Sequence, residues 1–159
     1  PMKMTGRDLD VAIEGKGFLV LQGPSGLLYT RNGNLQVNAQ GAVVTTEGYA
    51  VLGENGPTQL SPGPVTISTA GEIAVNASPV DTLKVVDLKD KFLVQKVGNS
   101  SFRSPESSAT PLEPGETSIQ QGGLEQSNVN PVREMMLMIN VMRQFEALQK
   151  TIYTMMNAV

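Results

Sequence analysis

The first hundred residues alternate short apolar runs with turn residues, which is the pattern of a β domain. Phe18–Leu21 is an uninterrupted apolar run, and the turn residues Gly23-Pro24-Ser25-Gly26 follow it closely. Similar runs recur with turn signals about every eight to twelve residues, without βαβ alternation. The pattern therefore predicts a mainly β fold, an antiparallel β-sandwich or barrel-like domain. The predicted strands span residues 9–13, 18–22, 28–31, 35–38, 42–46, 49–52, 65–68, 73–76, 83–88 and 92–97.

Two of the turns have specific residue signals. Asn32-Gly33 is the strongest hairpin signal in the chain, because both residues tolerate positive φ angles. It predicts a hairpin between residues 28–31 and 35–38. Gly15-Lys16-Gly17 lacks the third glycine of a dinucleotide-binding loop and precedes a strand, so it is interpreted as a turn.

The pattern changes after residue 99. Residues 100–123 are rich in Ser, Pro, Gly and Glu and carry few large apolar side chains, which favours an irregular connecting arm. A helix start then follows, with Asn128 just before it, Asn130 as N-cap, Pro131 at the first helical position and Glu134 in the first turn. The predicted division is a β domain over 1–99, an irregular arm over 100–127 and a C-terminal helix over 128–159.

The C-terminal segment has the apolar spacing of a long helix. Apolar residues recur at alternating intervals of three and four, and Gln149 is the only polar member of this seam. Further apolar residues flank the seam on both sides, so more than one face of the helix is apolar. Such a helix is either a long core helix of its own domain or a helix that packs against other chains. The residues expected to carry assembly contacts are Met135, Met138, Ile139, Met142, Phe145, Leu148, Ile152 and Met156.

Composition argues against catalysis. The chain has no His and no Cys, which removes the commonest general base, the commonest metal ligands and any disulfide. Asp8 and Asp10 are too few carboxylates for a calcium site and are interpreted as solvated charges at a strand edge. No Gly-x-Ser-x-Gly elbow is present, and a Ser–Lys pair is the one catalytic arrangement left open. We therefore predict no enzyme activity, no cofactor, no metal site and no small-molecule substrate.

Charge and hydropathy limit the possible partners. Lys and Arg are scattered, the net charge is −3, and Trp is absent, so nucleic-acid binding is not expected. The longest apolar stretch, around Met135–Ile139, is too short to span a bilayer, and no signal peptide is evident. Membrane insertion is therefore not expected.

Two stretches resemble a known family. The first is Thr5–Phe18 (TGRDLDVAIEGKGF), followed by Tyr29–Leu35 (YTRNGNL) and Gly48–Gly53 (GYAVLG). The second is Gly123–Val132 (GLEQSNVNPV), which runs into the helix with Arg143–Ala147 (RQFEA). In this order they are similar to the bacterial flagellar basal-body rod and hook family. The resemblance is weakest between residues 56 and 122. Ser-Asn-Val-Asn-Pro and Arg-x-Phe-Glu resemble the proximal-rod member more than the distal-rod member.

This resemblance implies a structural subunit rather than an enzyme. Members of the family are exported through the flagellar type III apparatus and assemble helically in the periplasm as a drive shaft and export channel. The implied partners are copies of the chain and other flagellar rod and hook proteins. Family members pair an N-terminal helix with the C-terminal one, and this sequence begins where their β domain begins. A truncated chain is therefore expected, which would lack the intrachain partner of its helix.

Three alternatives stay open from the sequence. The chain could be a distal-rod or hook-type axial protein of the same family. It could instead be a non-flagellar β binding module whose helix is an intrachain strut. A hydrolase that uses a Ser–Lys pair is the third.

Overall fold

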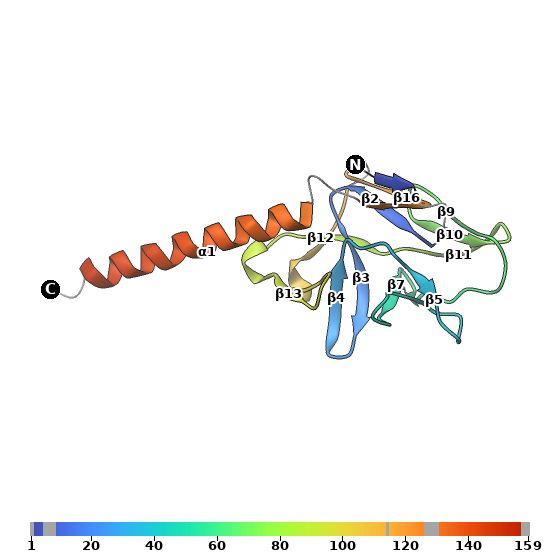
Figure 1. Cartoon of the computed structure of the whole chain (residues 1–159), viewed down its shortest axis with the longest axis horizontal. Helices are drawn as coiled ribbons and strands as arrows, with labels where there is room; N and C mark the ends of the chain where they lie inside the picture. The colour runs from blue at the N-terminus through green and yellow to red at the C-terminus, as the bar shows by residue number, and fades with distance from the viewer. Residues whose placement is uncertain (1, 5–8, 114, 126–130, 157–159) are drawn as a thin grey trace.

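The computed structural model of the chain describes residues 2–4, 9–113, 115–125 and 131–156. These residues form a β domain and one long C-terminal helix that projects from it (Figure 1), as predicted for the fold class. The helices are α1 (Pro131–Met156) and the 3₁₀ helices η1 (Lys91–Leu93) and η2 (Glu106–Ser108). The strands are β1 (Met2–Met4), β2 (Val11–Gly15), β3 (Phe18–Gly23), β4 (Gly26–Thr30), β5 (Gln36–Val37), β6 (Val43–Val44), β7 (Ala50–Gly53), β8 (Gly56–Pro57), β9 (Val65–Ile67), β10 (Glu72–Val75), β11 (Ser78–Thr82), β12 (Val85–Leu88), β13 (Gln95–Val97), β14 (Ser101–Arg103), β15 (Ala109–Pro111), β16 (Thr117–Gln121) and β17 (Gly123–Glu125).

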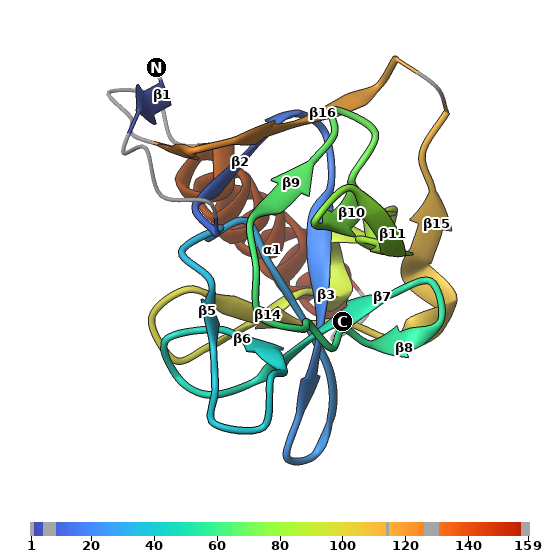
Figure 2. The same ribbon diagram turned by 90° about the vertical axis from the view of Figure 1, so that its right-hand side faces the viewer.

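The strands form one large antiparallel sheet and several smaller ones. The large sheet has ten strands, in the order β13-β14-β4-β3-β7-β6-β5, with β12, β15 and β8 attached at its side. A three-stranded sheet has the order β11-β10-β9, and the pairs β16–β2 and β1–β17 complete the described strands. Viewed with α1 behind the domain, these sheets curl around a common centre as a half-barrel (Figure 2).

β3 lies at the centre of this arrangement and separates two hydrophobic cores. It pairs with β4, β7 and β12, so its backbone is bonded on both edges. Leu19 and Leu21 point into one core cluster, whereas Phe18 and Val20 point into the other. Burial on both faces explains why this strand is a continuous apolar run instead of an alternating one.

Gly33 does not form the hairpin turn that was predicted. The segment around it runs beside the start of β2, where the Val11 amide donates to the Gly33 carbonyl (2.9 Å) and the Leu35 amide donates to the Leu9 carbonyl (3.1 Å). A β-carbon on Gly33 would overlap the Val11 carbonyl oxygen. Glycine is therefore required here for close approach of two backbones, which the dipeptide signal alone does not distinguish from a tight turn.

Residues 100–127 also differ from the irregular arm that was predicted. This segment contributes β14, β15, β16 and β17, and β14 and β16 pair with β4 and β2. The reason lies in two large apolar side chains: Phe102 in β14 and Ile119 in β16 are 1% and 2% exposed. One large buried apolar side chain is enough to hold a strand at the edge of an existing core. A segment of mostly polar composition can therefore still form a strand.

The segment predicted as a strand over 92–97 begins with a turn. Asp90 Oδ1 accepts a hydrogen bond from the Phe92 amide (3.2 Å), and the Leu93 amide donates to the Asp90 carbonyl (3.2 Å). These bonds form η1, and only Gln95–Val97 is extended as β13. The turn leaves Phe92 and Leu93 on the surface, 41% and 48% exposed.

A buried arginine holds the turn between β2 and β3. The Arg31 guanidinium, 6% exposed as a residue, donates to the carbonyls of Ile13 (2.8 Å), Gly15 (2.8 Å) and Gly17 (3.0 Å). These carbonyls turn inward where the chain reverses, and the fork of donors on one guanidinium satisfies all three. No local signal in the sequence marks Arg31 for this structural role.

The interpretation of Asp10 as a solvated charge is wrong. Asp10 is 1% exposed, it forms an isolated β-bridge with Asn34, and its carbonyl accepts a short hydrogen bond (2.6 Å) from the Gly122 amide. It therefore belongs to the junction where β2, the 31–35 segment and the end of β16 meet. Asp8 lies outside the described residues.

Candidate assembly surfaces

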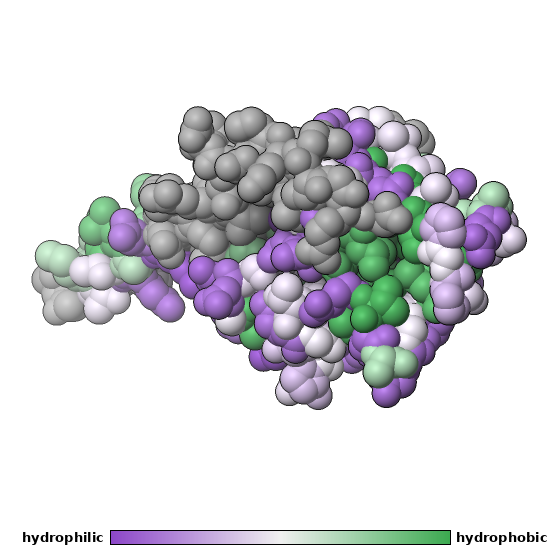
Figure 3. All heavy atoms as spheres, turned by 45° about the vertical axis from the view of Figure 1, so that its right-hand side comes forward, coloured by the Kyte–Doolittle hydropathy of each residue, from purple (hydrophilic) through white to green (hydrophobic). Residues whose placement is uncertain are grey.

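The first candidate surface is the outer half of α1. The 26 residues of this helix extend about 39 Å at 1.5 Å per residue, and the helix points away from the β domain (Figure 1). Green and pale-green apolar residues are visible at its free end (Figure 3). Large apolar side chains stay exposed along this half. They are Phe145 (60%), Leu148 (57%), Ile152 (48%), Tyr153 (70%), Met155 (68%) and Met156 (73%).

These side chains form one broad face. At about 100° per residue, Phe145, Leu148, Ile152 and Met156 fall within one sector, which Met155 and Tyr153 flank on either side. The residues on the remaining arc are polar or small, as for Arg143, Ala147, Lys150, Thr151 and Thr154. Covering six half-exposed apolar side chains would contribute on the order of 10 kcal/mol before the cost of association. An apolar face of this width is unusual on a helix exposed to water.

The other predicted residues are the remaining assembly residues of α1 and the residues at the start of the helix. Met142 is half-buried at the base of this face. Met135, Met138 and Ile139 lie in the first half of α1, and their side chains fall outside the described structure. The helix begins at Pro131, whereas Asn128 and Asn130 fall outside the described residues.

The second feature is the contact between α1 and η1. One nitrogen of the Arg143 guanidinium donates to the carbonyls of Phe92 (3.2 Å) and Val94 (3.3 Å). Beside it lies a groove of about 750 Å³, lined by Asp90, Phe92, Met142, Phe145, Glu146 and Gln149. Arg143 thus ties the helix to the turn after β12 and directs it outward. In the sequence, Arg143 stands out only as the first residue of the Arg-Gln-Phe-Glu-Ala stretch. That stretch does not indicate which groups Arg143 contacts.

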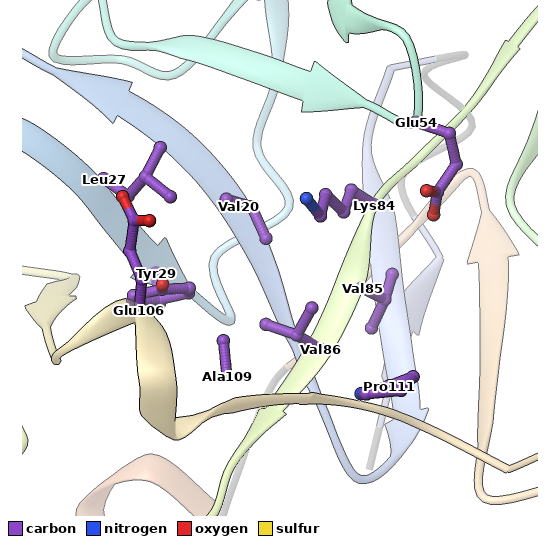
Figure 4. Close-up of a pocket in the computed structure, with 10 residues that line it drawn as sticks. All are labelled: Val20, Leu27, Tyr29, Glu54, Lys84, Val85, Val86, Glu106, Ala109 and Pro111. Carbon is purple, nitrogen blue, oxygen red and sulfur yellow. The ribbon is translucent and has the colours of Figure 1, made fainter.

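The third feature is a pocket on the β domain, here called the Tyr29 pocket. It has a volume of about 310 Å³ and is lined by Val20, Leu27, Tyr29, Glu54, Lys84, Val85, Val86, Glu106, Ala109 and Pro111 (Figure 4). Its floor belongs to the second core cluster, which contains Val20, Tyr29 and Val86. Burial raises the pKa of the Tyr29 hydroxyl above its ordinary value, and the Glu106 carboxylate raises this pKa further.

Three charged side chains, Glu54, Lys84 and Glu106, line the Tyr29 pocket. The Lys84 side chain extends across the pocket towards Val20, whereas the Glu106 carboxylate lies beside Leu27 and Tyr29 (Figure 4). Within the described part of the chain, Lys84 and Glu106 form no ion pair. The pocket therefore has an apolar floor with one cation, Lys84, and two carboxylates, Glu54 and Glu106, at its sides.

Other sites of chemistry are not evident in the described residues. Among them, no three His, Cys, Asp or Glu side chains are grouped so that they could hold a metal ion. No helix in this part of the chain combines the length and apolar character needed to span a bilayer.

The fold thus defines a class of protein: a curled antiparallel β domain that carries one long, outwardly directed C-terminal helix. Residues 12–79 match the family model described as the flagellar hook protein FlgE/F/G D1 domain. Residues 120–156 match the model described as the C-terminal part of the flagellar basal body rod FlgEFG proteins. The two matches together cover more than half of the chain, which belongs to this family of flagellar rod and hook proteins.

Individual relatives agree with the family models. The chain is 36% identical over 153 residues to the flagellar basal-body rod protein FlgF of Caulobacter vibrioides, covering 94% of this chain and 62% of that protein. It is 37% identical over 163 residues to FlgF of Salmonella typhimurium, with coverage of 93% and 64%. It is 31% identical over 164 residues to the rod protein FlgG of Bacillus subtilis, with coverage of 94% and 62%. The chain thus spans about three fifths of the length of the curated relatives it matches, and the family is structural rather than enzymatic.

Proposed function

We propose that this chain is part of a structural subunit of the bacterial flagellar basal-body rod. In this proposal the subunit polymerises helically, the β domain sets the spacing and lateral contacts, and α1 carries the principal polymer contacts. The polymer forms part of the drive shaft and of the export channel. The observation that carries the proposal is the broad apolar face of α1, which the chain's own β domain leaves exposed.

A helical polymer needs subunits that present contact surfaces to several neighbours at once. In a helical polymer each subunit makes head-to-tail contacts that do not close, so every copy presents surfaces to several neighbours. A helix that is directed away from its own domain and exposes Phe145, Leu148 and Ile152 is suited to such contacts. An intrachain strut would instead bury this face against the domain that it supports.

The proposed partners and location follow from the family. The partners are copies of the chain and other flagellar rod and hook proteins. The location is the periplasmic rod of the basal body, reached by export through the flagellar type III apparatus. Relatives named FlgF and FlgG support a rod subunit. We favour the proximal rod over the distal rod or the hook because of the Ser-Asn-Val-Asn-Pro and Arg-x-Phe-Glu stretches.

The contact residues proposed on α1 are the eight that its spacing predicts, and the start of the helix is assigned to Asn128, Asn130 and Pro131. The eight are Met135, Met138, Ile139, Met142, Phe145, Leu148, Ile152 and Met156.

The test compares two faces of the same helix. Leu148→Asp combined with Ile152→Asp places two charges on the apolar face. Ala147→Asp combined with Thr151→Asp places the same charges on the polar face, at positions that are also exposed. Each pair is introduced into the full-length gene, and rod incorporation and swimming are measured. We expect the first pair to abolish both and the second pair to retain them, with unchanged far-ultraviolet circular dichroism for both. Normal swimming with the first pair would refute the proposal.

A further inference from the structure

The turn between β7 and β8 contains an Asn-Gly pair, Asn55-Gly56, that takes no part in the candidate assembly surfaces. We infer that Asn55 is a site of spontaneous deamidation, in which its side-chain amide cyclises onto the Gly56 nitrogen and is then hydrolysed to a carboxylate. The modification breaks a contact between the large sheet and the three-stranded sheet. This inference goes beyond the proposed rod function and does not depend on it.

The reaction needs only water and the chain itself. The Gly56 nitrogen, which has no neighbouring β-carbon to hinder it, loses its proton to hydroxide and attacks the side-chain carbonyl carbon of Asn55. A carbon–nitrogen bond forms, the bond to Nδ2 breaks, and Nδ2 leaves as ammonia with a proton taken from water. Water then opens the cyclic imide at either of its carbonyls. The product is aspartate, or isoaspartate when the main chain runs through the former side chain.

The structure leaves Asn55 accessible to this reaction. β7 ends at Gly53 and β8 begins at Gly56, so Asn55 lies in a two-residue turn at the end of a hairpin (Figure 2). Asn55 is exposed, and the space that a β-carbon on Gly56 would occupy is open. The hydrogen bonds that hold Asn55 lie at the surface, where competition with water makes their net contribution small.

The other Asn-Gly pair of the chain, Asn32-Gly33, is an internal comparison. Asn32 is exposed as well, but Gly33 is buried and its carbonyl accepts the Val11 amide (2.9 Å). The Asn34 amide also donates to Asn32 Oδ1 (3.1 Å). Ring closure requires the backbone between asparagine and glycine to rotate, which at this site would break the contact with Val11. Reaction at Asn32 therefore requires local opening of the β domain.

Asn55 takes part in a contact between two sheets, here called the Asn55 clamp. The Asp81 carboxylate accepts hydrogen bonds from the backbone amide (3.3 Å) and the side-chain amide (3.1 Å) of Asn55, and from the Thr82 amide (2.8 Å). The Glu54 amide donates to the Thr82 carbonyl (2.9 Å). Glu54 and Asn55 follow β7 of the large sheet, whereas Asp81 and Thr82 belong to β11 of the three-stranded sheet. The clamp therefore joins these sheets.

Deamidation replaces a donor in the Asn55 clamp by an acceptor. The new carboxylate would lie beside the Asp81 carboxylate with no N–H group to share between them, so the two groups repel each other. Glu54 is adjacent in the chain and adds negative charge, whereas the Lys84 ammonium extends away from Glu54 towards Val20 (Figure 4). Isoaspartate also adds a methylene carbon to the main chain of the turn. The modified turn is therefore expected to separate from β11.

Mass spectrometry of the full chain tests the modification. The chain is incubated at mildly alkaline pH, and the amide-to-acid conversion is followed in the peptides that contain Asn55 and Asn32. In the folded chain we expect Asn55 to react at least about tenfold faster than Asn32, because only Asn32 requires local opening. In urea, where both sites are unfolded, the two rates should agree within about threefold. Asn55→Gln should abolish the conversion at this position, since the longer side chain closes the ring poorly.

Hydrogen exchange tests the effect on the Asn55 clamp. Asn55→Asp carries the charge of the product, and we expect exchange of the Glu54 amide, which donates across the clamp, to accelerate at least about tenfold. Asn55→Asp combined with Asp81→Asn interchanges the amide and the carboxylate and should restore most of the protection. Asn38→Asp is the matched control, because the exposed Asn38 uses its Oδ1 only as an acceptor for the amides of Gln40 and Ala42. It should leave exchange of the Glu54 amide unchanged.

Three outcomes would overturn the inference. The first is a rate at Asn55 in the folded chain that is no higher than the rate at Asn32. The second is unchanged exchange of the Glu54 amide in Asn55→Asp, which would show that the new charge does not open the clamp. The third is equal exchange in Asn55→Asp and in the double variant. None of these measurements involves α1, so their failure leaves the rod proposal untouched, and a failed rod proposal leaves the modification untouched.

Discussion

Replacing Arg31 by methionine tests how the turn between β2 and β3 is held. Methionine fills much of the same space but removes the donors to the carbonyls of Ile13, Gly15 and Gly17. Two of these hydrogen bonds are buried, so their carbonyls would lose their partners without gaining water. We therefore expect Arg31→Met to destabilise the whole β domain and not only the local turn.

The magnitude follows from the number and kind of these bonds. Hydrogen bonds to a charged donor contribute about 1.5–3 kcal/mol each, but the values are not additive and the buried guanidinium also has a desolvation cost that methionine avoids. The net loss in the free energy of unfolding should be about 3–5 kcal/mol. For a domain with an unfolding free energy of about 5–15 kcal/mol, this is a large fraction of the total.

Urea denaturation followed by circular dichroism measures this loss. With a slope of about 1–3 kcal/mol per molar urea, the midpoint should fall by on the order of 2 M. Arg103→Met is the matched control, because Arg103 is exposed on β14, and its free energy of unfolding should stay within about 0.5 kcal/mol of the parent value. If Arg31→Met changed stability no more than Arg103→Met, the assignment of Arg31 as the residue that holds this turn would be wrong.

Two other predictions concern the β domain. Gly33→Ala should cost about 3 kcal/mol in urea unfolding, because its β-carbon overlaps the Val11 carbonyl, whereas Gly48→Ala, with open space around it but a positive φ, should cost only about 1–2 kcal/mol. Equal costs at the two positions would contradict the close backbone approach. The raised pKa of Tyr29 means that the folded chain holds this proton more tightly than the unfolded chain, so this stabilisation is complete below about pH 10 and is lost as the pH rises further. The fall in stability above pH 10 should be smaller in Tyr29→Phe and in Glu106→Gln, and a fall as steep as in the parent would contradict the prediction.

The parts of the fold that could be predicted depend on local signals. The run Phe18–Leu21 indicates a strand because it is apolar at every position and ends at glycine and proline, and β3 is the most central strand observed. β11 was missed because Pro79 and Asp81 read as turn residues, although the strand pairs with β10 through a register shift. Asn32-Gly33 was misinterpreted because a glycine needed for contact with a distant strand looks the same as one needed for a turn.

The candidate surfaces also include features that local sequence signals predict and features that depend on contacts between distant residues. The helical spacing of Phe145, Leu148 and Ile152 is local, so the sequence predicted which face of α1 is apolar. Whether the β domain covers that face depends on where the helix points, and the hydrogen bonds from Arg143 to the carbonyls of Phe92 and Val94 contribute to this direction. The Tyr29 pocket combines residues from β3, β4, β12, η2 and β15, and sequence patterning contains no signal for that combination.

The most direct test of the account is the reactivity of one thiol on α1. Ile152→Cys in the otherwise cysteine-free chain is labelled with a maleimide, first as free subunit and then in isolated basal bodies, with Ser25→Cys in the exposed β3–β4 turn as the comparison. The account predicts fast labelling of residue 152 in the free subunit and strong protection in the rod. Labelling of residue 152 at the same rate in both states would show that this face stays in contact with water after assembly, which contradicts the central claim.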